Sequence, residues 1–176
     1  MTLVDFSDQP SSQKQLAPRM VALGAGRLGL WGKPSPRRFG EWRAKGLTTV
    51  LTLLSTAEYA LSVGTAVLNA GLAWHWFEQA NGKALPVPQR YELLRKLQTI
   101  NLEIDSGSWV LIHCAAGLHR TGMAAYALLR LRGLDGFSAL ALIEQMRPVT
   151  RDGVGEKRLG WVETWLAEFQ GAGKSQ

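Results

Sequence analysis

The chain has 176 residues and a formal net charge of +6 at pH 7, and 46% of its residues are hydrophobic. This size and composition are typical of one globular domain with its own core, and no apolar stretch approaches the ~20 residues that span a bilayer. The basic residues are scattered, which argues against a dedicated nucleic-acid surface, and the single cysteine excludes an intramolecular disulfide.

The N-terminal segment, residues 1–19, is polar and rich in turn-forming residues, so we expect a flexible lead-in there. It carries Asp5 and Asp8 and has no apolar core, so it does not fit a secretory signal. Together with the single cysteine, this favours a reducing, cytoplasmic compartment. We expect one folded domain over residues 20–170 and a frayed tail over residues 171–176.

Segments of strand and helix character alternate along this domain. The strand-like segments are mainly apolar and cover residues 20–31, 47–54, 72–77 and 109–112. The first of these segments forms either one strand or two short ones. The helix-like segments cover 36–45, 55–69, 88–104, 121–132, 138–146 and 156–169. Ser35 and the capping box Ser55–Glu58 predict two of the helix starts. The order predicts an α/β fold: a single domain with a central, mostly parallel sheet and helices on both faces.

Two patterns in the sequence could be mistaken for ligand sites. The run Gly24–Gly29 matches the dinucleotide-binding fingerprint Gly-x-Gly-x-x-Gly. No helix can begin there, because glycine and proline interrupt the chain within a turn, so we interpret the glycines as a tight turn. Aromatic residues at a spacing of four near the C-terminus predict core packing of a helix face; they are Trp161, Trp165 and Phe169.

The segment His113–Gly122 carries the strongest chemical pattern. An apolar strand leads into Cys114, and a helix leads out of the segment. In such a strand–loop–helix unit, backbone N–H groups and the positive helix end point at one place, which suits an anion. A thiolate there is a nucleophile, and an arginine, Arg120, follows the cysteine six positions on. The alternative for a lone cysteine after a strand is an inert core residue.

The segment resembles the His-Cys-x5-Arg-Thr/Ser signature of the cysteine-dependent protein tyrosine phosphatases, and it is most similar to the small dual-specificity and atypical members. The resemblance extends over roughly residues 20–169 and is strongest over 109–122. It implies the α/β fold of these phosphatases and the hydrolysis of phosphate monoesters through a cysteinyl-phosphate. It implies no cofactor and no metal ion.

The resemblance also implies roles for single residues. Cys114 would attack phosphorus, Arg120 would clamp the phosphoryl oxygens, and Thr121 would hydrogen-bond the departing thiolate. His113 would fix the loop, and the side chain of His119 either adds positive charge or fills the loop. The loop would bind phosphoryl oxygens through the backbone N–H groups of Ala115, Ala116, Gly117, Leu118, His119 and Arg120.

One part of the family pattern is missing. The family normally places a general acid, an aspartate, on a loop roughly thirty residues before the cysteine, where it protonates the leaving oxygen. Here that loop, residues 78–86, has no aspartate, and Glu78 is its only carboxylic acid. Asp152, in the expected turn Arg147–Gly153, is a second candidate. It would serve either as the acid or as a residue that positions water. The simpler interpretations are an exposed loop charge for Glu78 and a turn former for Asp152.

We therefore interpret the chain as a phosphotyrosine or dual-specificity protein phosphatase. One alternative is a phosphate-binding pseudophosphatase module without a competent general acid, and another is a phosphatase of phosphoinositides or inositol phosphates. Sulfur or arsenate chemistry on a similar cysteine loop fits the signature less well. The expected partner is a phosphorylated protein or another anionic phosphate ester, with no nucleic acid and no membrane span. The sequence leaves the oligomeric state open.

Overall fold

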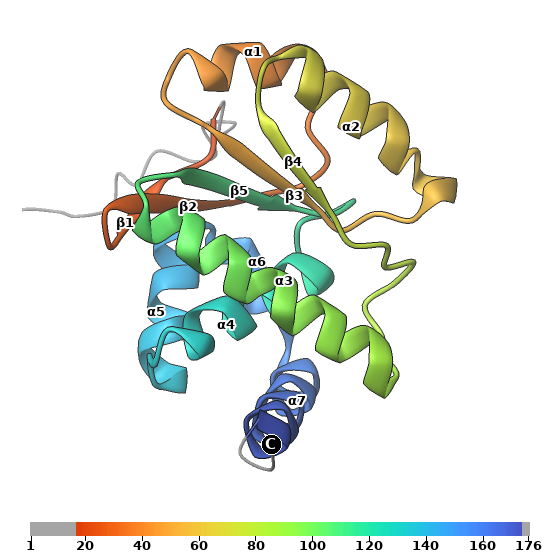
Figure 1. Ribbon diagram of the computed structural model, residues 1–176, viewed down its shortest axis with the longest axis vertical. Helices are drawn as coiled ribbons and strands as arrows, with labels where there is room; N and C mark the ends of the chain where they lie inside the picture. Colours follow the sequence, from red (N-terminus) through yellow and green to blue (C-terminus); the bar gives the residue numbers. More distant parts are fainter. Residues whose placement is uncertain (1–16, 174–176) are drawn as a thin grey trace, which may run out of the picture.

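The computed structural model describes residues 17–173. Its five strands form one sheet in the order β1-β2-β5-β3-β4 (Figure 1). Their bounds are β1 Val21–Leu23, β2 Gly26–Trp31, β3 Thr49–Thr52, β4 Ala73–Trp76 and β5 Trp109–His113. The edge strand β1 pairs antiparallel with β2, and the other pairings are parallel. The expected mostly parallel sheet is therefore confirmed.

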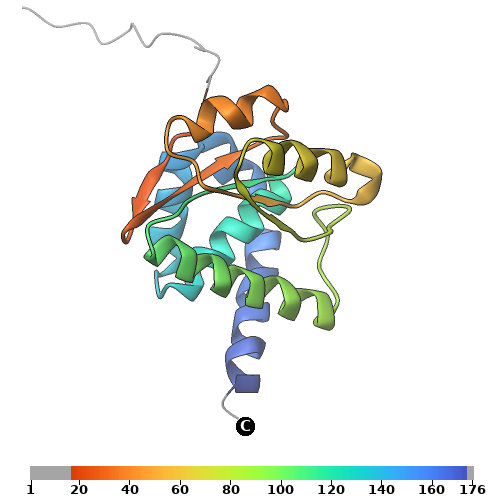
Figure 2. The same ribbon diagram turned by 45° about the horizontal axis from the view of Figure 1, so that its top comes forward.

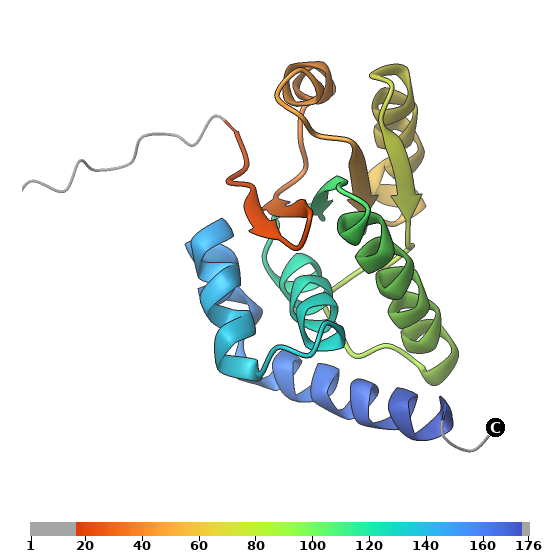
Figure 3. The same ribbon diagram turned by 60° about the vertical axis from the view of Figure 1, so that its left-hand side comes forward.

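Helices cover both faces of this sheet, as expected. Their bounds are α1 Arg37–Arg43, the 3₁₀ turn η1 Thr56–Glu58, α2 Ala60–Asn69, α3 Val87–Asp105, α4 His119–Leu131, α5 Gly136–Met146, α6 Pro148–Val154 and α7 Glu156–Gly173. The helices α1 and α2 lie on one face, and α3, α4 and α5 lie on the other (Figure 3). The last helix, α7, packs on α3 and α4 and extends away from the sheet (Figure 2).

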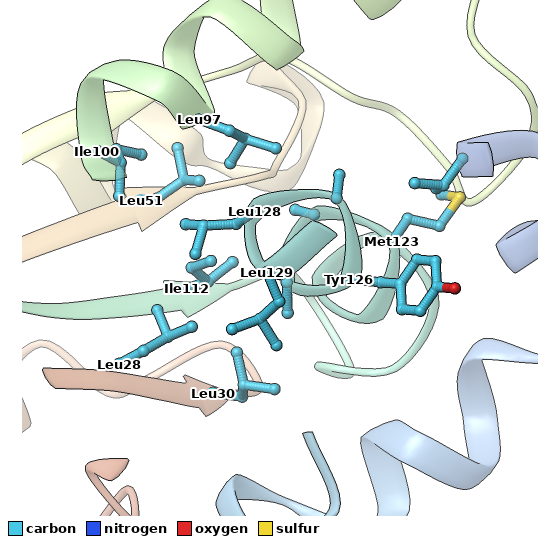
Figure 4. Packing of buried hydrophobic residues seen from close by; sticks show 14 of the residues in the cluster. Leu28, Leu30, Leu51, Leu97, Ile100, Ile112, Met123, Tyr126, Leu128 and Leu129 are labelled. Carbon is cyan, nitrogen blue, oxygen red and sulfur yellow. The ribbon is translucent and has the colours of Figure 1, made fainter. Parts of the chain in front are cut away.

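The central strands send alternate side chains into two separate apolar layers, as the pleat of a strand requires. On β3, Val50 packs with the residues of α1 and α2, whereas Leu51 packs with those of α3 and α4. On β5, Leu111 and Ile112 divide in the same way. Figure 4 shows Leu51 and Ile112 among side chains of α3 and α4. Burial on both faces explains why these strands are continuous apolar runs in the sequence.

The capping box begins a shorter element than expected. Ser55 and Glu58 form the box, but it opens the 3₁₀ turn η1 instead of a continuous helix. Tyr59 then adopts a left-handed φ of 66°, so α2 begins only at Ala60. Lys33, which follows β2, contacts the chain at this break: its ammonium donates to the carbonyl of Glu58 and lies 5.2 Å from the centre of the Tyr59 ring.

Other local expectations have mixed outcomes. The segment expected as a turn around Asp152 is the helix α6, which Pro148 opens, at a position that tolerates proline. Ser35 makes no capping hydrogen bond through its side chain, and Pro36 is the N-cap residue of α1. The glycine run does form a tight turn between β1 and β2, with Gly24 at a φ of 64°. The aromatic face of α7 does pack on the core, and Trp165 is buried.

The two ends of the expected domain cannot be compared in full with the structure. The expected lead-in over residues 1–19 lies almost wholly outside the described residues. At the other end, α7 continues to Gly173, and residues 174–176 lie outside the description. Within residues 17–173, no helix combines the length and the apolar character that crossing a membrane requires.

Candidate active site

Four parallel strands end at one edge of the sheet, where the loops that follow them meet. Cys114 comes directly after the central strand β5, and Lys33 follows β2. Glu58 follows β3, and Gln79 follows β4. Open α/β sheets bind ligands at this carboxyl edge. The fold therefore delivers a thiol, an ammonium group, a carboxylate and an amide to the expected place.

We call the loop between β5 and α4, residues 114–118, the signature loop. The thiol of Cys114 lies at its base, and Cys114 is only 2% exposed. The backbone N–H of Gly117 donates to Sγ over 3.2 Å, and the hydroxyl of Thr121 donates to it over 3.1 Å. Both donors aim at the sulfur and would form charge-assisted hydrogen bonds with an anionic sulfur. The contact of Thr121 is the one that the family resemblance implies.

Gly117 gives the loop its shape. Its φ is +72°, and a Cβ there would lie 2.3 Å from the carbonyl oxygen of Trp31, so the position requires glycine. Its own carbonyl accepts hydrogen bonds from the guanidinium of Arg147 and from the hydroxyl of Thr150, both over 2.6 Å. The start of α6 therefore holds the signature loop in place from outside.

The loop offers backbone donors to a ligand. Within residues 17–173, the N–H groups of Ala115, Ala116 and Leu118 have no hydrogen-bond partner. The helix α4 begins at His119, two residues earlier than expected, and the first N–H groups of a helix have no acceptor within it. These donors and the positive end of α4 together suit the binding of a phosphoryl group.

The guanidinium of Arg120 is held along one of its two edges. Nη1 and Nη2 donate to the carboxylate oxygens of Glu58 over 2.6 and 2.7 Å, and Nη1 also donates to the carbonyl of Gln79 over 2.6 Å. The other edge presents Nε–H and one Nη2–H side by side; neither is bound by Glu58 or Gln79, and the nearby thiol of Cys114 contributes to the raised pKa of Arg120. This edge matches two oxygens of a phosphoryl group.

The pairing also fixes the charges of Glu58 and Arg120. The hydrogen bonds from Arg120 lower the pKa of Glu58 to about 2, so this carboxylate is ionised at neutral pH. In return, the hydrogen bond to Glu58 raises the pKa of Arg120.

His113 is buried beside the nucleophile and is neutral, because burial lowers its pKa to about 4. Nδ1 lies 3.3 Å from the carbonyl oxygen of Cys114, so the proton of the ring must be on Nδ1. Nε2 then accepts from the hydroxyl of Thr52, and the oxygen of Thr52 accepts from the indole N–H of Trp74, each over 2.9 Å. A chain of hydrogen bonds across three strands therefore fixes this ring and its tautomer.

The loop between β4 and α3, where the general acid was expected, is tied to the signature helix and to α7. Arg120 binds the carbonyl of Gln79, and Arg158 donates to the carbonyl of Gly82 over 2.9 Å. A Cβ on Gly82 would lie 2.6 Å from the Cβ of His119, so the two backbones are in close contact. Burial and the charges of Arg158 and Arg120 lower the pKa of His119, which favours its neutral form, and the residue is exposed at the surface.

The two candidate acids do not contact the signature loop. Glu78 Oε1 accepts from the N–H and the hydroxyl of Thr56 over 2.8 and 2.9 Å. These hydrogen bonds lower the pKa of Glu78, whereas a general acid at neutral pH needs a raised one. The side chain of Asp152 is 74% exposed on α6, while Thr150 of the same helix faces the loop. A role as the acid stays a prediction for both.

Sequence reasoning missed several residues that the structure brings to this site, among them Glu58, Arg147 and Thr150. The capping box accounted fully for Glu58, and no local pattern indicates that its side chain also reaches an arginine 62 positions away. Arg147 and Thr150 lie in a segment that was interpreted as a turn, so the helix that aims both at Gly117 was not expected.

The structure thus brings together a buried thiol with two donors, a loop of N–H groups without partners and an arginine at one edge of an α/β sheet, an arrangement that suits thiol-dependent phosphate chemistry. In a comparison with known protein families, residues 65–138 match the sequence model of the tyrosine phosphatase family. This match covers less than half of the chain, and together with the solved structures it is consistent with the superfamily of cysteine-dependent protein tyrosine phosphatases. No curated protein matches the sequence significantly.

Solved structures share the fold, and 145 of their chains match. The active form of Tk-PTP is 25% identical, with a TM-score of 0.63 over 82% of this chain and 93% of its own. Kinase-associated phosphatase, with its catalytic-site cysteine substituted by serine, is 14% identical, with a TM-score of 0.69 over 90% of this chain and 98% of its own. The PP-IP phosphatase Siw14 from S. cerevisiae is 18% identical, with a TM-score of 0.58 over 82% of this chain and 83% of its own.

Proposed function

We propose that the protein is a phosphatase that hydrolyses phosphate monoesters through a phosphocysteine on Cys114. The observation that carries the proposal is the pairing of a nucleophile and a clamp. The sulfur receives hydrogen bonds from Gly117 and Thr121, and the carboxylate partner of Arg120 binds only one edge of its guanidinium. The match of residues 65–138 to the tyrosine phosphatase family and the likeness to Tk-PTP support the same chemistry.

The first step forms the covalent intermediate. The phosphoryl group binds to the N–H groups of the loop and to the other edge of Arg120, which spreads and stabilises the charge of the transition state. The thiolate of Cys114 attacks phosphorus in line, so the S–P bond forms while the bond to the leaving oxygen breaks.

The second step regenerates the enzyme. Water attacks phosphorus, the S–P bond breaks, and the bond's electron pair returns to sulfur. Thr121 stabilises the departing thiolate because its hydroxyl already donates to Sγ over 3.1 Å. Arg120 holds the phosphoryl oxygens through both steps.

Two variants test this proposal with a small aryl phosphate as substrate. We expect Cys114→Ser to abolish turnover and to retain binding of inorganic phosphate. We expect Arg120→Lys to lower kcat/KM about 10²–10³-fold, because a point charge cannot replace two parallel donors. Arg38→Lys is the matched control, since Arg38 pairs with Glu41 on α1, and it should behave as the wild type. Full turnover in Cys114→Ser would overturn the proposal.

A second candidate function is a binding module without catalysis. It is favoured by one observation, the engagement of Glu78 with Thr56, which takes the expected acid away from the signature loop. The unmodified protein would then capture a phosphopeptide stoichiometrically and release no phosphate.

The relatives do not agree on a substrate. The name of Siw14 assigns PP-IP substrates to that protein, whereas Tk-PTP and kinase-associated phosphatase carry the general names of phosphatases. For this chain, a phosphorylated protein is the substrate that we propose first, and phosphoinositides or inositol phosphates are the alternative.

A further inference from the structure

We propose that Arg147 and Thr150 of α6 are positioning residues that control how tightly the site binds a phosphoryl group. Because they hold the carbonyl of Gly117, they direct the N–H of Leu118 toward the ligand. This inference rests on the proposed phosphatase function and concerns how the same site binds its anion. A peptide unit is planar, and in the trans form its N–H points away from its C=O. Donors that bind a carbonyl on the outer side of a loop therefore turn the N–H of the same peptide unit inward.

The free N–H groups of the signature loop and its held carbonyls belong to the same peptide units. Within residues 17–173, all peptide units are trans. In that part of the chain three N–H groups of the loop have no partner, those of Ala115, Ala116 and Leu118. Each shares a peptide unit with the carbonyl of the preceding residue. All three of these carbonyls accept hydrogen bonds, and the donors come from His113, Lys33 and α6. A loop that presents N–H groups to an anion requires this arrangement.

Two side chains of α6 hold the carbonyl of Gly117. Nη1 of Arg147 and the hydroxyl of Thr150 both donate to it over 2.6 Å. Nη1 of Arg147 also donates to the hydroxyl oxygen of Thr150 over 3.0 Å. Hydrogen bonds in a chain polarise one another, so a carbonyl that accepts from a guanidinium makes the N–H of its own peptide unit a stronger donor. That N–H belongs to Leu118, the last residue before α4.

Close packing fixes α6 against the signature loop. A Cβ on Gly122 would lie 2.6 Å from the Cβ of Val154, so the backbone of α4 approaches α6 more closely than a side chain allows. A Cβ on Gly153 would lie 3.1 Å from the Cβ of Leu118. Thr150 and Val154 are fully buried. The donors of α6 are therefore in place before a phosphoryl group arrives, and binding does not have to order them.

Arg147 also brings a positive charge to the site. The residue is half-buried, and no carboxylate of residues 17–173 forms an ion pair with it. Burial lowers the pKa of Arg147, whereas the thiol of Cys114 acts in the opposite direction, so the two groups interact electrostatically. The acceptors of Arg147 are neutral oxygens, and a phosphate dianion in the loop would balance its charge.

The test measures the binding of inorganic phosphate without turnover. Phosphate bound over Sγ protects Cys114 from alkylation by iodoacetamide, so the alkylation rate at several phosphate concentrations gives a Kd. We expect Arg147→Met to raise this Kd about 10- to 100-fold and Thr150→Val about 2- to 10-fold, as the loss of a charged and of a neutral hydrogen bond would. Arg151→Met is the matched control, since Arg151 is exposed on the same helix and pairs with Asp152.

A second measurement separates positioning from a loss of structure. The two donors to Sγ, the N–H of Gly117 and the hydroxyl of Thr121, do not belong to the peptide unit that α6 holds. In Thr150→Val, the pH profile of alkylation without phosphate should therefore match the wild type. Thr150→Ser keeps the hydroxyl and should restore the Kd of the wild type.

Three results would overturn the inference. The first is a Kd in Arg147→Met and Thr150→Val equal to that of the control, and the second is a raised Kd in Thr150→Val together with a shifted alkylation profile. The third is a wild type that phosphate does not protect. Failure of the proposed function looks different: phosphate would protect Cys114 in the wild type and its Kd would rise in the variants, but no aryl phosphate would be hydrolysed.

Discussion

At the scale of single residues, Arg120 serves two partners on two edges of one planar group. Glu58 and the carbonyl of Gln79 occupy one edge, and the phosphoryl group of the substrate fits the other. The Arg120 side chain is 9% exposed and that of Glu58 is 28% exposed, so the pair is partly withdrawn from water. Glu58 therefore positions the arginine before substrate arrives, which reduces the entropy that binding must overcome.

The first prediction concerns Glu58→Gln. The amide keeps the size of the side chain but loses the charge and one acceptor, and a hydrogen bond to a charged group contributes about 1.5–3 kcal/mol. We expect kcat/KM for an aryl phosphate to fall roughly 10- to 100-fold. Glu41→Gln is the control, because Glu41 pairs with Arg38 at the surface. Equal activity of the two variants would mean that Glu58 does not position Arg120.

The same pair also predicts a dependence of stability on pH. Folding lowers the pKa of Glu58 from its ordinary value of 4.5 to about 2. The contribution of Glu58 to the free energy of unfolding is therefore complete above pH 4.5 and is lost as the pH falls toward 2. In thermal unfolding, the difference in Tm between wild type and Glu58→Gln should shrink over this range. A difference that grows on acidification would contradict the assigned pairing.

At the scale of elements, three neighbouring strands cooperate to orient one imidazole ring. Trp74 on β4 donates to Thr52 on β3, which donates to His113 on β5. Because His113 is buried and neutral, its Nε2 can accept from Thr52 while its Nδ1–H donates to the carbonyl of Cys114. The register of the sheet supports this chain, since Thr52 pairs with His113 and with Trp76.

The prediction at this scale concerns Thr52→Val. Valine keeps the shape of threonine but leaves two groups without partners, the buried Nε2 of His113 and the partly buried indole N–H of Trp74. We expect the free energy of unfolding to fall by about 1–3 kcal/mol in urea titrations. Thr164→Val, on the exposed face of α7, is the matched control. A Thr52→Val variant as stable as its control would contradict the hydrogen-bond chain.

The elements also show how far the sequence could predict this site. The segment around Cys114 was predictable because strand, loop and helix are consecutive, so a local pattern contains the whole cradle. The capping box at Ser55 was predictable for the same reason, and it is present. The left-handed backbone conformation of Tyr59 was not predictable, because it is accompanied by a contact with Lys33, which follows a different strand. The pairing of Glu58 with Arg120 was not predictable either, because it arises only from tertiary packing.

At the scale of the whole molecule, the alternation of apolar segments was enough to predict the α/β class and the sheet. Periodicity reports which segments are buried on two faces, and β3 and β5 are such strands. It does not report strand order, so the central place of β5 came only with the structure. For the general acid, by contrast, the sequence itself was informative. A missing aspartate was visible in the sequence, but only the contact of Glu78 with Thr56 shows where the remaining carboxylate goes.

The most direct measurement of the central claim is the mass of the intact protein, quenched in acid during turnover of an aryl phosphate. Thr121→Ala is used beside the wild type, because loss of the hydroxyl on Sγ should slow hydrolysis of the intermediate and let it accumulate. We predict a gain of one phosphoryl group, located on Cys114 by peptide analysis and absent from Cys114→Ser. Turnover without any such adduct, or an adduct on another residue, would contradict the account.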